Sequence, residues 1–250
     1  MKMMIDVHCH LTDNVFQDRL DEIINEAKKV GVQAFISSSL GFKDSIKLLE
    51  LSDYKTIYPS IGLMPYQLED YEEVVELIEK NSDKIIAIGE VGLDYHPSIN
   101  VDKNIQEKIF AEFIELARRL NLPLIVHSRS AGKYALQILF KHDAERTIMH
   151  AFDGSASHAE EAVKKGYYFS IPPSIARSQQ KQKIVKRIPL ENLLLESDAP
   201  ALSPVPGEIN KPSNIRISAE WISKLKSLSI DKVEEKTTEN AQLIFKIKII

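Results

Sequence analysis

Short apolar runs alternate along the chain with longer segments in which apolar side chains recur every three or four residues. The short runs are typical of strands, and the recurring segments are typical of helices with one buried face. The expected strands are residues 4–8, 34–38, 56–61, 85–89, 123–127, 146–150, 168–171 and 193–196. The expected helices are residues 16–27, 45–51, 71–79, 105–120, 134–140, 156–164, 178–185, 215–227 and 232–245.

The expected strands are apolar throughout, as in 85–88 and 122–126, which favours a parallel sheet covered on both faces. Eight strand–helix repeats in 250 residues match the number and size of a (β/α)8 TIM barrel, an α/β fold. We therefore expect a single TIM-barrel domain over residues 1–250. A doubly wound open sheet is the alternative, because periodicity alone does not close a barrel. Residues 199–214 hold four prolines and are expected to form a long loop after the last strand.

Composition narrows the class of protein. The chain is 44% hydrophobic and 27% charged, which is ordinary for a globular protein. A net charge of −4 argues against a broad basic face for nucleic acid, but not against an enzyme with a small nucleic-acid site. The one cysteine, Cys9, excludes an intrachain disulfide. With no secretory-signal pattern and no apolar stretch of about 20 residues, we expect a cytoplasmic protein without membrane association.

Metal-ligating side chains stand at the ends of five expected strands. Because the carboxyl ends of barrel strands meet at one mouth, four histidines and two carboxylates are expected to converge there. Six ligands are too many for one tetrahedral ion and enough for two divalent ions, Mg²⁺, Mn²⁺ or Zn²⁺, which share a bridging carboxylate. This predicts metal-assisted hydrolysis of an ester or amide, phosphodiesters included. The candidate ligands are His8, His10, Glu90, His127, His150 and Asp198.

The remaining histidines and the cysteine are expected to have ordinary structural roles. His96, His142 and His158 are not at strand ends, and an isolated histidine is more often a core or surface residue than a ligand. Cys9 lies between two candidate ligands and should point to the opposite face, as a small core residue.

Five motifs, in this order, resemble the TatD family of metal-dependent deoxyribonucleases, which are TIM barrels related to the amidohydrolases. The match runs from residue 4 to about residue 200. The motifs are His8-Cys-His10-Leu, Gly89-Glu-Val-Gly-Leu-Asp-Tyr95, His127-Ser-Arg129, His150-Ala-Phe-Asp-Gly-Ser155 and Leu195-Glu-Ser-Asp-Ala-Pro200.

The resemblance implies a role for each candidate ligand. His8 and His10 would bind a first ion with Asp198, and Glu90 would bridge to a second ion. His127 and His150 would complete that second site. Glu90 and Asp198 would be the catalytic carboxylates, with Asp198 receiving the proton of the attacking water.

The resemblance also implies DNA as a transient substrate and no obligate protein partner. Arg129 follows His127 and would face the mouth to hold a phosphate, or form a salt bridge at the barrel rim. Tyr95 would line the pocket or pack in the core, and Lys211 would supply a positive charge. The DNA interpretation predicts a local basic strip at the mouth, made of Arg129, Arg177, Lys211 and Arg216.

Three positions depart from the family pattern. Met64 stands where the family usually has a histidine, and Ile209 stands where it often has an arginine. Asp153 would repel a phosphate if it faced the mouth. The metal ligands are thus intact while the expected substrate contacts are altered.

Two other functions therefore stay open. One is an amidohydrolase-like hydrolase of a small amide, lactone or phosphoester, and the other is a metal-binding barrel without catalysis. No lysine ends strands 85–89 or 123–127, where a carboxylated lysine would bridge the ions, so the TatD-like branch is favoured over the classical amidohydrolases.

Overall fold

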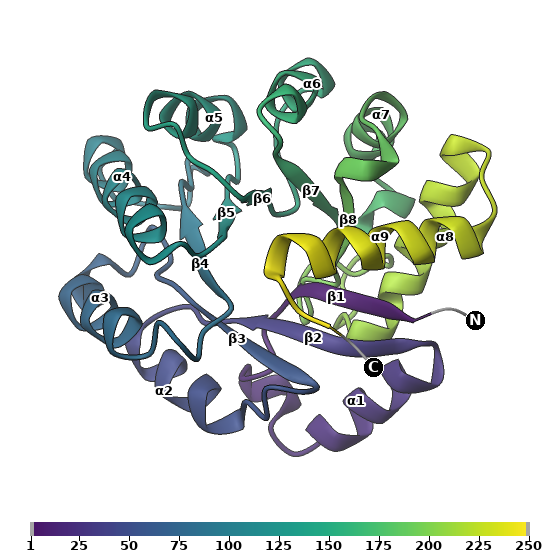
Figure 1. Cartoon of the computed structure of the whole chain (residues 1–250), viewed down its shortest axis with the longest axis horizontal. Helices are drawn as coiled ribbons and strands as arrows, with labels where there is room; N and C mark the ends of the chain where they lie inside the picture. The colour runs from purple at the N-terminus through teal and green to yellow at the C-terminus, as the bar shows by residue number, and fades with distance from the viewer. Residues whose placement is uncertain (1–2, 249–250) are drawn as a thin grey trace.

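The computed structural model describes residues 3–248, so the first two and last two residues of the predicted domain lie outside it. Eight parallel strands form one sheet in which spatial order follows chain order (Figure 1). In a doubly wound sheet the strand order reverses at a switch point, and here it does not, so the predicted TIM-barrel class is confirmed and the open-sheet alternative is wrong. The strands are β1 (Met4–Cys9), β2 (Val32–Ser38), β3 (Ile57–Ile61), β4 (Ala87–Gly92), β5 (Leu124–His127), β6 (Thr147–Met149), β7 (Tyr168–Ile171) and β8 (Leu193–Leu195).

Helices surround this sheet, and α9 crosses one end of the barrel (Figure 1). Short 3₁₀ helices add η1 (Asn14–Phe16), η2 (Leu68–Asp70), η3 (Pro173–Ala176), η4 (Leu190–Asn192) and η5 (Pro212–Asn214). The α-helices are α1 (Leu20–Lys29), α2 (Phe42–Leu51), α3 (Tyr71–Lys80), α4 (Lys103–Leu120), α5 (Gly132–Lys141), α6 (Ala156–Lys164), α7 (Gln179–Arg187), α8 (Ile215–Lys226) and α9 (Ile230–Phe245).

The first helix begins later than its apolar spacing predicts. Phe16 belongs to η1, where the Asp13 carboxylate accepts a hydrogen bond from Val15 N, and α1 begins only at Leu20. The described part of the chain contains no helix long and apolar enough to cross a membrane.

The barrel interior is a separate apolar cluster that α9 closes. Side chains from strands that are not neighbours meet in it, together with Ala241, Ile244 and Phe245 of α9. Polar contacts fix the helix in place: Asn240 Nδ2 donates to the carbonyl oxygens of Leu190 and Leu193, both at 2.9 Å. The strand residues of this cluster are Ile5, Val7, Ala34, Ile36, Ala87, Ile125, Ile148 and Leu194.

A buried carboxylate joins the first strand to the segment after the last. Asp6 is fully buried, and it accepts hydrogen bonds from Ser197 N at 2.8 Å and from Ser197 Oγ at 2.6 Å. Beside it, Asp198 N donates to the carbonyl oxygen of His8 at 2.9 Å. Burial raises the pKa of Asp6 to about 7, although the bonds from Ser197 act against this rise. The seam of the barrel therefore depends on side-chain as well as backbone bonds.

Two strands depart from regular pairing near their carboxyl ends. The register of β1 shifts between Asp6 and Cys9, and that of β4 shifts between Ile88 and Val91. A bulge of this kind re-aims a side chain. The predicted strand 85–89 is thus displaced toward the mouth, and Glu90 lies inside β4 rather than after it.

The closing helix gives a matched test of the packing. We expect Ile244→Ala to lower the free energy of unfolding by about 2–4 kcal/mol, because Ile244 is 4% exposed and its loss leaves a cavity. Leu243→Ala removes the same number of carbon atoms one residue earlier, where the side chain is 70% exposed, and should cost at most about 0.5 kcal/mol. Urea unfolding of both variants measures the difference. Equal losses in the free energy of unfolding would contradict the conclusion that α9 closes the barrel interior.

Candidate metal centre

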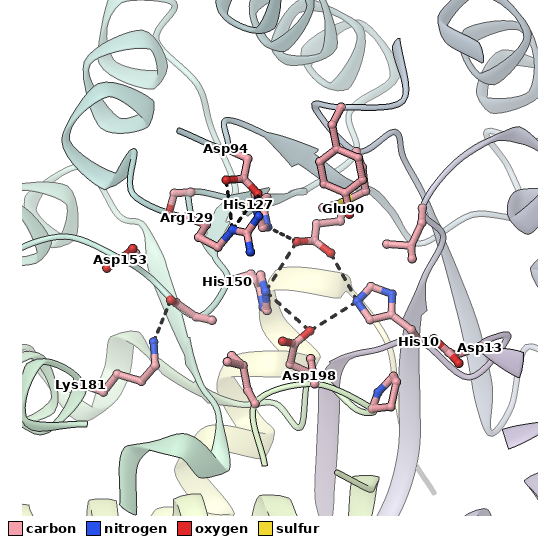
Figure 2. Close-up of a pocket in the computed structure, with 18 residues that line it drawn as sticks. His10, Asp13, Glu90, Asp94, His127, Arg129, His150, Asp153, Lys181 and Asp198 are labelled. Atoms are coloured by element: carbon pink, nitrogen blue, oxygen red, sulfur yellow. Dashed lines mark hydrogen bonds and ion pairs between the residues drawn. The ribbon is translucent and has the colours of Figure 1, made fainter. Parts of the chain in front are cut away.

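A cavity of about 410 Å³ opens at the carboxyl ends of the strands (Figure 2). Five of the six predicted ligands line it, and His8 is fully buried against them. The wall includes His10, Asp13, Leu40, Met64, Tyr66, Glu90, Asp94, His127, Arg129, His150, Asp153, Lys181, Asp198 and Leu202.

One group of ligand atoms gathers around the two histidines of the first strand and the chain just after it. His8 Nε2 lies 3.2 Å from Glu90 Oε2 and 3.5 Å from Asp198 Oδ1. His10 Nε2 lies 3.4 Å from each of the same two oxygens. Two imidazole nitrogens and two carboxylate oxygens therefore face a common point.

A second group gathers around the other oxygen of the glutamate. His127 Nδ1 lies 2.5 Å from Glu90 Oε1, and His150 Nε2 lies 3.6 Å from it. His150 Nε2 is also 3.8 Å from Asp198 Oδ1. Glu90 thus offers one oxygen to each group, which is the arrangement of a bridging carboxylate.

The backbone around Glu90 comes close to its neighbours at two glycines, Gly62 just after β3 and Gly92 at the end of β4. A Cβ on Gly62 would lie 2.4 Å from the Glu90 carbonyl oxygen. Gly92 has a φ of +147°, and a Cβ there would lie 2.1 Å from the His127 carbonyl oxygen. Only glycine permits these approaches, so the two positions let β4 sit where its carboxylate reaches both histidine groups.

The outward nitrogens of the first two histidines bond to one serine. His10 Nδ1 is 2.9 Å from the Ser38 carbonyl oxygen, which only accepts hydrogen bonds. His10 therefore carries a proton on Nδ1, and Nε2 presents its lone pair to the cavity when the ring is neutral. His8 Nδ1 lies 3.0 Å from Ser38 Oγ.

Buried carboxylates contact the outward nitrogens of the other two histidines. His150 Nδ1 lies 2.7 Å from Glu196 Oε2, which also accepts a hydrogen bond from Ser170 Oγ at 2.5 Å. His127 Nε2 lies 3.1 Å from Asp94 Oδ2. These bonds leave Nε2 of His150 and Nδ1 of His127 as the nitrogens available for an ion.

One buried nitrogen of the centre is not satisfied by a hydrogen bond. Within residues 3–248, His8 Nε2 makes no hydrogen bond of acceptable geometry, although carboxylate oxygens of Glu90 and Asp198 lie 3.2 Å and 3.5 Å away. Leaving a buried polar atom unsatisfied is costly, and a cation between it and the carboxylates would satisfy it. Combined with a donor set of imidazoles and carboxylates, this fits one or more divalent metal ions.

The centre is electrostatically polarised even without an ion. Desolvation raises the pKa of Glu90, but the neighbouring histidines outweigh it and hold that pKa well below its usual range. Desolvation lowers the pKa of His8, yet Glu90 and Asp198 raise it to about 9. The pKa of His127 is likewise raised to about 9, by Glu90 and Asp94. The carboxylates are thus ionised, and they favour positive charge among them.

The candidate substrate contacts divide into one that lines the cavity and two that do not. Arg129 lines the cavity, and its Nη2 also lies 2.8 Å from Asp94 Oδ2. The side chain therefore faces the mouth and forms a salt bridge at the same time. Tyr95 instead donates to Glu107 Oε1 at 2.6 Å, and Lys211 forms an ion pair with Glu26 on α1. The geometry gives no support to Tyr95 or Lys211 as substrate contacts.

The predicted basic strip does not form at the cavity. Arg216 pairs with Glu234, and Arg177 Nε donates to the Ser203 carbonyl oxygen at 3.1 Å, so both stabilise α9 or the long loop. Asp153 does line the cavity, where it accepts a hydrogen bond from Ser130 N at 2.7 Å.

Four residues of the centre escaped the sequence analysis. Asp94 and Glu196 lie inside the quoted motifs, and a search for carboxylates able to orient the ligands would have found them. Tyr66 follows the altered position Met64. Lys181 comes from α7 and carries no strand-end signal.

Comparisons with known proteins agree on one family. The sequence model of the family described as TatD related DNase matches residues 5–246. A human protein named deoxyribonuclease TATDN3 is 42% identical, over 97% of this chain and 94% of its own. The uncharacterized metal-dependent hydrolase YabD of Bacillus subtilis is 36% identical, over 98% of this chain and 100% of its own. The crystal structure of YjjV, a TatD homologue from Escherichia coli, superposes with a TM-score of 0.90 at 28% identity and covers 98% of each chain.

The carboxylate behind His150 gives a test of metal binding. Glu196→Gln keeps the shape but leaves one oxygen to accept from His150, Ala151 N and Ser170. We expect the affinity for Mn²⁺, measured by calorimetry, to fall by about 10–100-fold. Glu191→Gln on η4 removes an exposed carboxylate and should leave the affinity unchanged. An unchanged affinity in Glu196→Gln would show that this bond does not orient a ligand.

The raised histidine pKa values predict proton release on metal binding. With a pKa of about 9, His8 and His127 are protonated at neutral pH without an ion, and a protonated imidazole is no ligand. Apparent affinity should therefore rise with pH until about pH 9 and then level off. Calorimetry in buffers of different ionisation enthalpy counts the protons, and an ion that binds at neutral pH without releasing any would contradict this account.

Proposed function

The chain belongs to the TatD family, and from that premise we propose that it is a metal-dependent hydrolase that cleaves phosphodiester bonds of DNA. The observation that carries the proposal is the position of Glu90, which turns one oxygen toward His8 and His10 and the other toward His127 and His150. Support also comes from the human relative, which is named a deoxyribonuclease.

We assign the ligands to two sites. His8, His10 and Asp198 would hold one divalent ion, and His127 and His150 would hold the other, with Glu90 shared between them. Bound there, divalent cations supply Lewis-acid chemistry: they polarise a phosphodiester and make water a stronger acid at neutral pH.

Asp198 is suited to take the proton of the attacking water. Its Oδ1 faces three imidazoles at 3.4–3.8 Å, and no hydrogen bond reaches its Oδ2 from residues 3–248. Desolvation raises the pKa of Asp198, but the neighbouring histidines outweigh it and hold the pKa below its usual range. The group is therefore ionised and has an oxygen free to accept a proton.

The cavity favours an anionic substrate. The Arg129 side chain is 45% exposed at the wall, so its guanidinium can meet a phosphate while it remains bonded to Asp94. The carbonyl of a neutral amide or lactone could accept a hydrogen bond from this cation, but it lacks the charge attraction that a phosphate has. Met64 adds an apolar surface where the family usually places an imidazole, so binding at that wall depends on packing.

The proposal is tested with chelator-stripped protein, end-labelled single-stranded DNA and bis(p-nitrophenyl) phosphate. Each substrate is incubated with Mg²⁺, Mn²⁺, Zn²⁺ or no ion. We expect metal-dependent shortening of the DNA, and a loss of at least about 100-fold in rate for Asp198→Asn, because that change removes the proton acceptor and weakens a proposed metal ligand at nearly constant volume. Circular dichroism of the variant checks that the fold is kept.

Each other outcome points to a different conclusion. Full activity of Asp198→Asn would overturn its assigned role. Turnover of the small ester without cleavage of DNA would indicate a hydrolase of small phosphoesters. Inactivity on both substrates with every ion would contradict the proposed function and favour a non-catalytic barrel.

A further inference from the structure

A lysine from outside the strands reaches the wall of the cavity. Lys181 lies in the first turn of α7, and its Nζ donates to the Ala151 carbonyl oxygen at 2.9 Å (Figure 2). Ala151 directly follows His150, so the ammonium stands beside the proposed metal centre. In Figure 2, Arg129 and Lys181 both lie on the side of the centre away from His10.

This ammonium has no carboxylate partner at ion-pair distance within residues 3–248, whereas Arg129 is paired with Asp94. Burial lowers the pKa of Lys181, and the charges of Glu196, Asp153 and Asp198, which favour the ammonium form, offset only part of this effect. A partly buried cation with one carbonyl contact keeps donors that a bound anion can use.

We propose that Lys181 binds a phosphate of the DNA strand next to the phosphate that is cut. The inference rests on the proposed function. Neither Glu90 nor Asp198 lies within ion-pair distance of its ammonium, so Lys181 stands outside the ring of ligands, where a neighbouring phosphate would lie. Lys181 thereby selects a polynucleotide over an ester with a single phosphate, and it offsets the repulsion from Asp153 on the same wall.

A purely structural role would look different. Through Ala151, whose backbone N donates to Glu196 Oε1 at 2.9 Å, Lys181 would hold the segment that carries His150. Its loss would then weaken metal binding and slow every substrate equally. The experiment must therefore compare substrates and measure metal dependence as well as rate.

The test compares Lys181→Met, which keeps most of the aliphatic stem, with Lys183→Met, which removes an exposed charge from the same helix. On a thymidine oligonucleotide, we expect Lys181→Met to lower kcat/KM by about 10–100-fold, mainly through KM, because a charge-assisted bond is lost. On bis(p-nitrophenyl) phosphate, which has only the phosphate that is cut, the change should be below about twofold. Lys181→Arg should restore much of the oligonucleotide activity, and Lys183→Met should resemble the wild type.

Two further readouts separate binding from positioning. The Mn²⁺ concentration for half-maximal rate should be the same in Lys181→Met and wild type. The slope of log affinity against log salt for the oligonucleotide should become less negative by about 0.7, the value for one phosphate contact on a single strand.

The proposal is overturned by an equal loss on both substrates, by a shifted Mn²⁺ requirement, or by no loss at all. If the wild type cuts neither substrate, the proposed function fails first. Fluorescence anisotropy with a labelled thymidine oligonucleotide then tests Lys181 by itself. Weaker binding by Lys181→Met than by Lys183→Met upholds the contact, and absent or equal binding rejects it.

Discussion

Crowding four imidazoles around two buried carboxylates is the constraint on which the rest of this structure depends. Each ring must turn one nitrogen toward the shared oxygens and have its other nitrogen held from behind. Ser38, Asp94 and Glu196 supply those outer partners. The irregular pairing of β1 and β4 and the bare backbone of Gly62 bring His8 and Glu90 to the same point. The irregular strand pairing and the close backbone approach at Gly62 therefore both lie near Glu90.

The barrel and the meeting of its ligands follow from features that are local in sequence. Apolar runs locate strands, parallel order brings their carboxyl ends together, and side chains such as His127 and His150 are then close whatever the helices do. What the pattern could not give is the direction of side chains that depend on loops and helix rotation. Tyr95 and Lys211 turn to partners on α4 and α1, whereas Lys181 turns inward from α7. The limits of β4 also differ from the predicted strand 85–89, because the pattern of apolar residues does not reveal the bulge that places Glu90.

Under the proposed function, the charges of the cavity explain how a chain with a net charge of −4 could bind an anionic substrate. Carboxylates predominate on the wall, and they are arranged around points where divalent cations would reverse the local sign. Two cationic side chains, Arg129 and Lys181, line the cavity.

The seam between the first strand and the segment after the last strand links the metal centre to the stability of the barrel. His8 and Asp198 flank the bonds by which Asp6 and Ser197 close the barrel, so the first strand and the segment after the last strand meet at the ligands. An ion held there is a cross-link between distant parts of the chain, and its binding free energy adds to the stability of the closed barrel. The supply of metal in the protein's surroundings would then set its lifetime as a folded molecule, as well as its rate as a catalyst.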